Sequence, residues 1–277
     1  MITGATTLIA HIGWPTHSFK SPMIYNPWFA SRGIDALVVP MGVPGPDFTA
    51  LLRPLFTIRN LHGALITMPH KVATAQLADE ATITAQIAGS ANALLRRPDG
   101  TLLADMFDGA GFVRGMERKG VSAQGRRALV VGSGGVGCAI AASLAAAGLA
   151  AIGLFDANPP SAEALAGRLR THYPKLDVST GSNDPAGWDI VVNATPLGMN
   201  DGDPLPFDVA RLAPATFVGE VVMKQEFTPM LEAAKARGCQ VQVGTDMLFE
   251  MIPAYLEFFG FGSATPEALR AVATIQY

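Results

Sequence analysis

The 277-residue chain has few of the features that mark secreted, metal-binding or membrane proteins. It contains two cysteines, Cys138 and Cys239, and these show neither C-x-x-C nor Cys/His ligand spacing. Neither a disulfide framework nor a zinc or other metal site is therefore predicted. No run of about 18 uninterrupted apolar residues occurs, and no charged segment precedes a long apolar run at the N-terminus. We expect a cytoplasmic protein with no membrane partner.

Charge is also sparse. Charged residues make up 16% of the chain and the formal net charge is −3, which provides no basic footprint for nucleic acid. The hydrophobic content of 49% is instead typical of a packed globular enzyme. The length exceeds that of one ordinary core, which predicts two domains. The expected partner is a small-molecule substrate, and a monomer and a homodimer both stay open.

The clearest motif lies within residues 128–148. A short apolar run predicts a buried strand, and Gly132, Gly134 and Gly137 follow at G-x-G-x-x-G spacing. Apolar residues then recur every fourth position, as on one face of a helix. Strand, glycine turn and helix occur in the order of the dinucleotide fingerprint, in which the helix N-terminus binds the pyrophosphate. A glycine turn that serves structure alone is the alternative.

A second apolar run, 151–155, ends at Asp156, close to the position of the ribose-binding acid in this motif, about 20 residues after the last glycine. A carboxylate there would accept hydrogen bonds from the ribose hydroxyls and repel a 2′-phosphate. Residues 157–161 contain no arginine or lysine that could bind such a phosphate. The predicted cofactor is therefore NAD. The alternative is that Asp156 only caps the next helix.

The remaining pattern predicts the domain organisation. Strands and helices alternate over residues 1–104, which indicates a small α/β substrate-binding and catalytic domain. The pattern changes near residue 105, and a Rossmann NAD-binding domain is expected over 105–244. A helix at 247–259 is too apolar to stand alone, so residues 245–277 are expected to complete the first domain. The predicted class is α/β: an open N-terminal α/β domain, a Rossmann domain and a returning C-terminal helix.

Seven motifs occur in a fixed order along the chain. They are Ser21-Pro22 after a Gly-x-Pro loop, Ile66-Thr67-x-Pro69-x-Lys71, Gly89-Ser-Ala-Asn92, Asp108-Gly-x-Gly-Phe112, Gly132-Ser-Gly-Gly135, Asn193-Ala-Thr-Pro-Leu-Gly-Met199 and Thr228-Pro229. Together they resemble the shikimate/quinate dehydrogenase family along essentially the full length. The resemblance implies a two-domain oxidoreductase that transfers hydride between a ring hydroxyl and a nicotinamide. It also implies aromatic amino acid biosynthesis, with a catabolic role left open.

The family's catalytic pair corresponds to Lys71 and Asp108. A lysine sheltered in a cleft can have a lowered pKa and accept the hydroxyl proton as hydride leaves. The aspartate would orient the ammonium and the hydroxyl. The alternative is an ion pair in which Lys71 stays charged. His70 replaces an apolar residue of the family, and we interpret it as a surface or helix-start histidine rather than a rival proton carrier.

The resemblance also implies the ligand-binding residues. Substrate contacts are expected from Ser21, Thr67 and Asn92. Cofactor contacts are expected from the turn Gly132, Ser133, Gly134, Gly135 and Val136, from Asp156, and from Asn193, Thr195, Val221 and Gly244.

Several polar positions of the family's substrate site are apolar in this chain. Phe19 stands where the family has a serine, Leu65 where it has an asparagine, and Met251 where it has a glutamine. Phe107 belongs to a similar replacement beside the catalytic aspartate. Each unmade buried hydrogen bond costs about 1–3 kcal/mol. We therefore expect Phe19 and Met251 to line an apolar pocket, shikimate to be a poor substrate, and a less hydroxylated or bulkier cyclic hydroxy compound to be preferred.

Two other functions stay open. One is a genuine shikimate or quinate dehydrogenase that uses NAD. The other is a non-catalytic protein that binds a metabolite or NAD, although the presence of both Lys71 and Asp108 argues against it. The arginine of the family's NADP clamp is replaced by Ala157, which agrees with the prediction of NAD made from Asp156.

Overall fold

The computed structural model describes residues 2–275, and the chain divides into two compact units. Unit 1 contains Met1–Phe107 and Ile252–Tyr277, and unit 2 contains Asp108–Met251. The sequence predicted these breaks at 104/105 and 244/245, whereas the structure has them at 107/108 and 251/252. The second break differs more because it falls inside one continuous helix, α9 (Gly244–Phe258), and not before it. None of the helices formed by the described residues has the length and apolar character needed to cross a bilayer.

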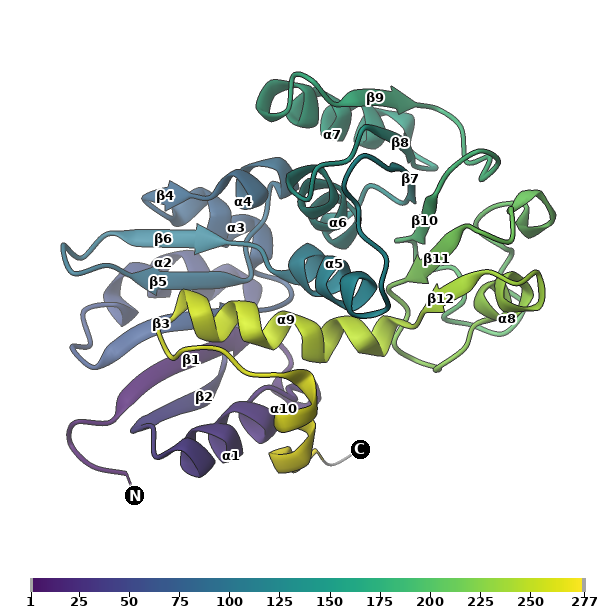
Figure 1. The fold of residues 1–277 in the computed structure, drawn as a ribbon. Helices are drawn as coiled ribbons and strands as arrows, with labels where there is room; N and C mark the ends of the chain where they lie inside the picture. Colours follow the sequence, from purple (N-terminus) through teal and green to yellow (C-terminus); the bar gives the residue numbers. More distant parts are fainter. Residues whose placement is uncertain (1, 276–277) are drawn as a thin grey trace. The chain divides into compact units, whose positions relative to one another are not determined.

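Unit 1 is built on a mixed six-stranded sheet, shown in Figure 1 in the order β2-β1-β3-β5-β6-β4. The strands are β1 (Thr7–Gly13), β2 (Ala36–Gly42), β3 (Leu61–Ile66), β4 (Glu80–Ala81), β5 (Ala93–Arg96) and β6 (Leu102–Asp105). β1 pairs in parallel with β2 and β3, whereas β5 is antiparallel to β3 and β6. Residues 9–13 of β1 are all buried, as expected for a strand covered on both faces.

Helices cover both faces of this sheet. They are α1 (Pro22–Arg32), α2 (Gly45–Leu55), α3 (Lys71–Leu77), α4 (Ile83–Ala88), the C-terminal half of α9, and α10 (Pro266–Val272). In Figure 1 the C-terminal half of α9 crosses one face and α2 and α3 lie on the other. The glycine at position 63 makes room for Phe259, since a Cβ there would lie 2.4 Å from the Phe259 ring. The apolar C-terminal segment thus packs directly on β3.

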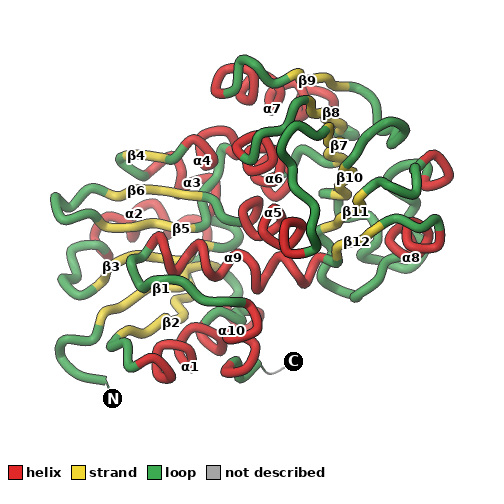
Figure 2. The backbone as a smooth tube through the Cα atoms, viewed as in Figure 1, coloured by secondary structure: helices red, strands yellow, loops and turns green. Residues whose placement is uncertain are grey.

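Unit 2 is a parallel six-stranded sheet, seen edge-on in Figure 2, in the order β12-β11-β10-β7-β8-β9. The strands are β7 (Arg127–Val131), β8 (Ala151–Phe155), β9 (Asp177–Thr180), β10 (Ile190–Asn193), β11 (Phe217–Glu220) and β12 (Gln240–Gln242). The accompanying helices are α5 (Asp108–Arg118), α6 (Gly135–Ala146), α7 (Pro159–His172) and α8 (Pro229–Ala236). This is the doubly wound Rossmann order, with its reversal between β7 and β10. The predicted α/β class is confirmed.

The sequence pattern does not reveal every element. Residues 102–105 form β6, so the sheet of unit 1 extends to the change of pattern near residue 105, and α5 begins at Asp108. Three further elements that the pattern leaves undefined are β4, β9 and α10. These elements are short or contain many polar residues, so hydrophobic periodicity alone does not reveal them.

Candidate functional site

The three glycines of the unit 2 fingerprint have different structural roles. Gly132 has a φ of +106°, and a Cβ there would lie 2.7 Å from the Ala194 carbonyl carbon. A Cβ at Gly137 would lie 2.0 Å from the Gly132 carbonyl oxygen. A Cβ at Gly134 would meet no atom within 4 Å. Gly132 and Gly137 therefore permit close packing, whereas Gly134 leaves an exposed backbone that a pyrophosphate could approach.

The start of α6 fits an anionic ligand. Gly134 is the N-cap, and no side chain caps the helix, so its first N–H groups point outward without a side-chain acceptor. The Ser133 hydroxyl oxygen is buried and has no hydrogen-bond partner among residues 2–275. Both features are consistent with a dinucleotide held by Ser133, Gly134, Gly135 and Val136, all of which lie in this turn.

Asp156 follows β8 at the same edge. Its carboxylate accepts hydrogen bonds from the backbone N–H of Ser133 at 2.7 Å and of Asn158 at 2.8 Å. These two bonds hold the carboxylate beside the glycine turn and leave each oxygen further acceptor capacity. The residue that caps α7 is Asn158, so Asp156 is not itself the helix cap.

The loop after β10 is shaped by Asn193, whose side chain is fully buried. Its Oδ1 accepts hydrogen bonds from the Thr195 N–H at 3.1 Å and the Thr195 hydroxyl at 2.6 Å, and its Nδ2 donates to the Leu197 carbonyl at 3.0 Å. These three hydrogen bonds lie within the loop, so the Asn193 side chain would influence a bound cofactor by fixing the shape of the loop. The Val221 N–H donates to the Asn193 carbonyl, and Gly244 packs on the backbone of Val222. The predicted cofactor residues therefore all lie at the carboxyl edge of the sheet.

Sequence reasoning missed one ionisable residue at this edge. Glu220, the last residue of β11, is completely buried and accepts a hydrogen bond from the Thr228 hydroxyl at 2.8 Å. Its other carboxyl oxygen has no partner among the described residues. Burial raises the pKa of Glu220 to about 7, against the lowering effect of the Thr228 and Asn193 side chains. A glutamate inside the apolar run 217–222 was the signal that could have identified it.

In unit 1, Thr67, Lys71 and Asn92 lie at the carboxyl end of β3. Lys71 begins α3, and its carbonyl accepts a hydrogen bond from the Ala91 N–H at 2.8 Å. The neighbouring Asn92 is buried; its carbonyl accepts from the Ile66 N–H, and its Oδ1 accepts from the Phe107 N–H at 2.9 Å. Asn92 thereby fixes the backbone directly before Asp108.

Phe19 and Thr67 converge over the end of β1. A Cβ at Gly13 would lie 2.3 Å from the Thr67 methyl carbon and 3.0 Å from the Phe19 ring. The Phe19 ring is buried and also stacks on His11, with 3.9 Å between ring centroids. Ser21 precedes α1, but its side chain does not cap that helix. Phe19, Thr67 and Gly13 form one continuous surface in unit 1.

Other predicted residues have different surroundings. The Phe107 ring packs edge-on against Tyr255 and Phe258, at centroid distances of 4.8 and 5.3 Å, within an aromatic cluster of unit 1. Met251 belongs to unit 2, where a Cβ at Gly111 would lie 2.7 Å from the Met251 Cβ. Asp108 is buried at the start of α5, also in unit 2, whereas Lys71 belongs to unit 1.

The interpretation of His70 as a surface residue was wrong, although it does precede a helix. Its side chain is buried, its ring stacks on Phe48 at 4.0 Å, and its Nε2 lies 2.7 Å from the Val43 carbonyl oxygen. Because a carbonyl only accepts, Nε2 is the donor. The Val43 carbonyl and the Phe48 ring hold the imidazole, so His70, the residue directly before Lys71, is anchored to segment 43–48.

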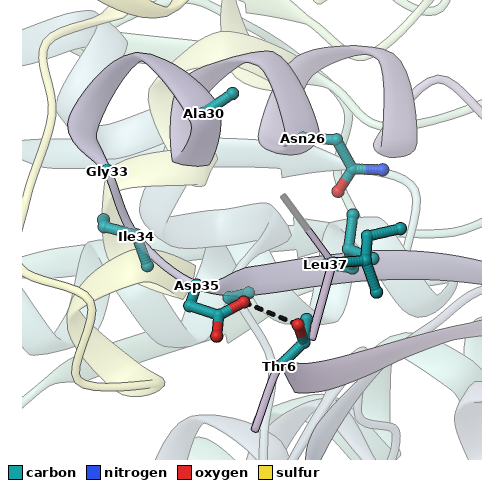
Figure 3. A pocket seen from close by; sticks show the side chains of 9 residues that line it. Thr6, Asn26, Ala30, Gly33, Ile34, Asp35 and Leu37 are labelled. Atoms are coloured by element: carbon teal, nitrogen blue, oxygen red, sulfur yellow. Dashed lines mark hydrogen bonds between the residues drawn. The ribbon is translucent and has the colours of Figure 1, made fainter. Parts of the chain in front are cut away.

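A surface hollow of unit 1 lies at the amino ends of β1 and β2, away from the carboxyl ends described above. Figure 3 shows it beside Thr6 and Asp35, which precede β1 and β2. The Thr6 hydroxyl donates to Asp35 at 2.6 Å, and the Asn26 amide bonds to the Val38 backbone as both donor and acceptor. These polar groups satisfy one another, so the hollow has no feature that points to a ligand.

Comparison with known proteins adds independent findings. The family model for the shikimate dehydrogenase substrate binding domain matches residues 12–94. The chain is 37% identical over 251 residues to the shikimate dehydrogenase (NADP(+)) of Rubrobacter xylanophilus, covering 89% of this chain and 88% of the relative. It is 36% identical over 276 residues to the corresponding protein of Acidiphilium cryptum, covering 99% and 98%.

Solved structures agree with this. Shikimate 5-dehydrogenase from Listeria monocytogenes, in complex with shikimate and NAD, superposes with a TM-score of 0.89 at 25% identity over 98% of this chain and 97% of that one. Quinate dehydrogenase from Corynebacterium glutamicum, in complex with NAD, superposes with a TM-score of 0.84 at 27% identity over 96% and 98%.

Proposed function

The chain belongs to the shikimate/quinate dehydrogenase family, and on this premise we propose that it interconverts a ring hydroxyl and a ketone, with shikimate as the first substrate to test. One observation carries the proposal. An open dinucleotide turn in unit 2 occurs in the same chain as Lys71, Thr67 and Asn92, which unit 1 places together at the carboxyl end of β3. The relatives named for shikimate support both the reaction class and a role in aromatic amino acid biosynthesis.

In this reaction Lys71 takes the proton of the substrate hydroxyl while hydride leaves the same carbon. A dinucleotide held by the Gly132–Val136 turn and Asp156 would supply the acceptor of that hydride. In the reverse direction Lys71 returns the proton to the carbonyl oxygen. Asp108 orients the Lys71 ammonium, and Asn92 positions the backbone that leads into Asp108.

A second substrate class is a ring alcohol with fewer hydroxyls. Phe19 and Leu65 are both buried and apolar, and they line the end of the unit 1 sheet at positions where the family has polar side chains. A hydroxyl placed against either would lose its hydrogen bonds to water without replacement. Phe107 contributes less to this argument because its ring is occupied by Tyr255 and Phe258.

The substrate is tested by steady-state kinetics with shikimate, quinate and less hydroxylated cyclohexene acids. Turnover of shikimate with a KM of about 1 μM–1 mM supports a true shikimate dehydrogenase. A shikimate kcat/KM far below that of a less hydroxylated ring supports the apolar pocket. Binding of a dinucleotide without oxidation of any of these alcohols would contradict the proposed reaction and favour a binding protein.

We further propose a preference for NAD over NADP. The Asp156 carboxylate is held at the end of β8 by two backbone N–H groups, where it would accept the ribose hydroxyls and repel a 2′-phosphate. Residue 157 is alanine, so the adjacent position supplies no cation. Relatives that share about a third of their residues with this chain are named for NADP(+), so the proposal separates this chain from them.

The ratio of kcat/KM for NAD to that for NADP tests the preference. The double variant Asp156→Asn/Ala157→Arg should shift this ratio toward NADP by about 10- to 100-fold, since it removes a repulsion and adds a charge-assisted hydrogen bond. Asp177→Asn on the exposed strand β9 is the matched control and should leave the ratio unchanged. A wild-type preference for NADP would show that Asp156 does not select the cofactor.

A further inference from the structure

One polar side chain in unit 1 has neither a role in the proposed reaction nor a full set of hydrogen bonds. His11 is 7% exposed, and its Nδ1 has no hydrogen-bond partner among the residues that the structure describes. Its neighbours in β1 are Ala10 and Ile12, which are completely buried and apolar. An unpaired buried nitrogen is costly, so its presence in this strand calls for a partner that binds there.

His11 lies beside residues that we propose to bind the substrate ring. In the sheet register His11 pairs with Leu65 of β3, so the two side chains lie on the same face. Gly13, two residues further along β1, shares this face. The Phe19 ring stacks on the imidazole at 3.9 Å, and it reaches the point above Gly13 where Thr67 also lies. The imidazole is therefore a neighbour of the residues proposed to bind the substrate ring.

The charge state of His11 restricts the ligand chemistry. Burial lowers the pKa of His11 to about 4, so the imidazole is neutral at physiological pH. A neutral imidazole has one N–H donor and one acceptor nitrogen, and it offers no positive charge to a carboxylate. A hydroxyl group, which both donates and accepts, can pair with Nδ1 in either tautomer.

We propose that His11 is a specificity-determining residue whose Nδ1 forms a hydrogen bond with a non-reacting hydroxyl of the substrate ring. This inference rests on the proposed function, because it assumes that the ring binds at Phe19 and Thr67. It means that the surface formed by Phe19 and Leu65 contains one polar anchor, and that the enzyme selects rings with an oxygen at that position.

The test compares His11→Phe, which retains a stacking ring without nitrogen, with His11→Asn, which retains a polar atom close to the position of Nδ1. His11→Phe should raise the KM for shikimate about 10- to 100-fold, change kcat less than threefold, and leave the Kd of the dinucleotide unaltered. His11→Asn should recover part of the loss. His62→Phe on β3 removes a histidine that is only half-buried and bonds to the Phe259 carbonyl, and it should leave KM unchanged.

Shikimate analogues that each lack one non-reacting hydroxyl identify the contact. For one of them, wild type and His11→Phe should show the same KM. Equal KM values of the two proteins for shikimate itself would overturn the proposal. If the wild type oxidises no ring alcohol, the proposed function has failed, and 15N shifts of the His11 ring then decide this inference: a change on adding shikimate supports it, and no change overturns it.

Discussion

The carboxyl edges of the two sheets, where we propose that cofactor and substrate bind, are built in different ways. In unit 2 the edge consists mainly of backbone: uncapped N–H groups of α6, glycines without side chains, and an aspartate held by two N–H groups. In unit 1 the edge consists of side chains from β1, β3 and the loop after β1, and it is largely apolar. A common cofactor can be recognised by backbone geometry, whereas a particular substrate has to be recognised by side chains.

The largest effect is expected from removing the proposed proton acceptor in unit 1, which should stop the reaction without changing dinucleotide binding in unit 2. Lys71→Ala should lower kcat by about 10²- to 10⁴-fold because the hydroxyl proton loses its acceptor. The Kd of the dinucleotide, measured by fluorescence titration, should stay within twofold of wild type. Lys175→Ala, an exposed lysine of unit 2, is the control and should retain full activity. An active Lys71→Ala enzyme would remove Lys71 from the mechanism.

The fingerprint glycines provide the next comparison. Gly134→Val should raise the Kd of the dinucleotide by about 100-fold, because a side chain there holds the backbone off the pyrophosphate. Its thermal midpoint should hardly change, since the new Cβ meets no atom within 4 Å. Gly132→Ala should instead lower the free energy of unfolding by about 1–3 kcal/mol, since its backbone is left-handed and packed on Ala194. Equal effects on both quantities in both variants would contradict the division of roles.

Two buried titratable groups should give the units opposite pH dependences of stability. The pKa of Glu220 in unit 2 is raised from 4.5 to about 7, so the folded state binds its proton more tightly and loses stability as the pH rises through this window. The pKa of His11 in unit 1 is lowered from 6.5 to about 4, so stability is lost as the pH falls through that window. Each contribution has an upper bound of about 3.4 kcal/mol.

Denaturant unfolding from pH 4 to pH 8 measures both slopes. Glu220→Gln should flatten the loss of stability between pH 4.5 and pH 7, and His11→Phe should flatten the loss between pH 6.5 and pH 4. Glu232→Gln, on the exposed face of α8, is the control for the first and should leave the profile unchanged. A Glu220→Gln profile parallel to that of wild type would show that folding does not shift the pKa of this carboxyl.

The smallest expected effect comes from an exposed ion pair of unit 1. Arg53 donates two hydrogen bonds of 2.8 Å to Asp79, which lowers the pKa of that carboxyl to about 2. Both side chains are more than a third exposed, so water and salt screen the interaction. Arg53→Met should lower the free energy of unfolding by less than about 1 kcal/mol at pH 7, measured by urea unfolding. A larger loss would mean that the pair anchors the β4 region.

The features of each unit could be predicted where they depend on contiguous residues and were missed where they depend on residues distant in the chain. The strand, glycine turn and helix of unit 2 are contiguous, so their spacing was readable, and Asp156 followed at a regular distance. Glu220 was missed because its burial depends on neighbours from β10 and the segment at Thr228. In unit 1 the burial of His70 depends on Val43 and Phe48, more than 20 residues earlier in the chain.

Residue order alone was enough to assign the α/β class, the dinucleotide turn and the family, because each depends on local spacing or on motifs in a fixed sequence. The partners of His11, Asn92 and Glu220 could not be assigned in this way. Their surroundings come from segments that are adjacent in space but distant in the chain: Leu65 beside His11, Phe107 beside Asn92 and Asn193 beside Glu220. Burial and hydrogen bonding are properties of that packing, and they determine which polar groups remain to meet a ligand.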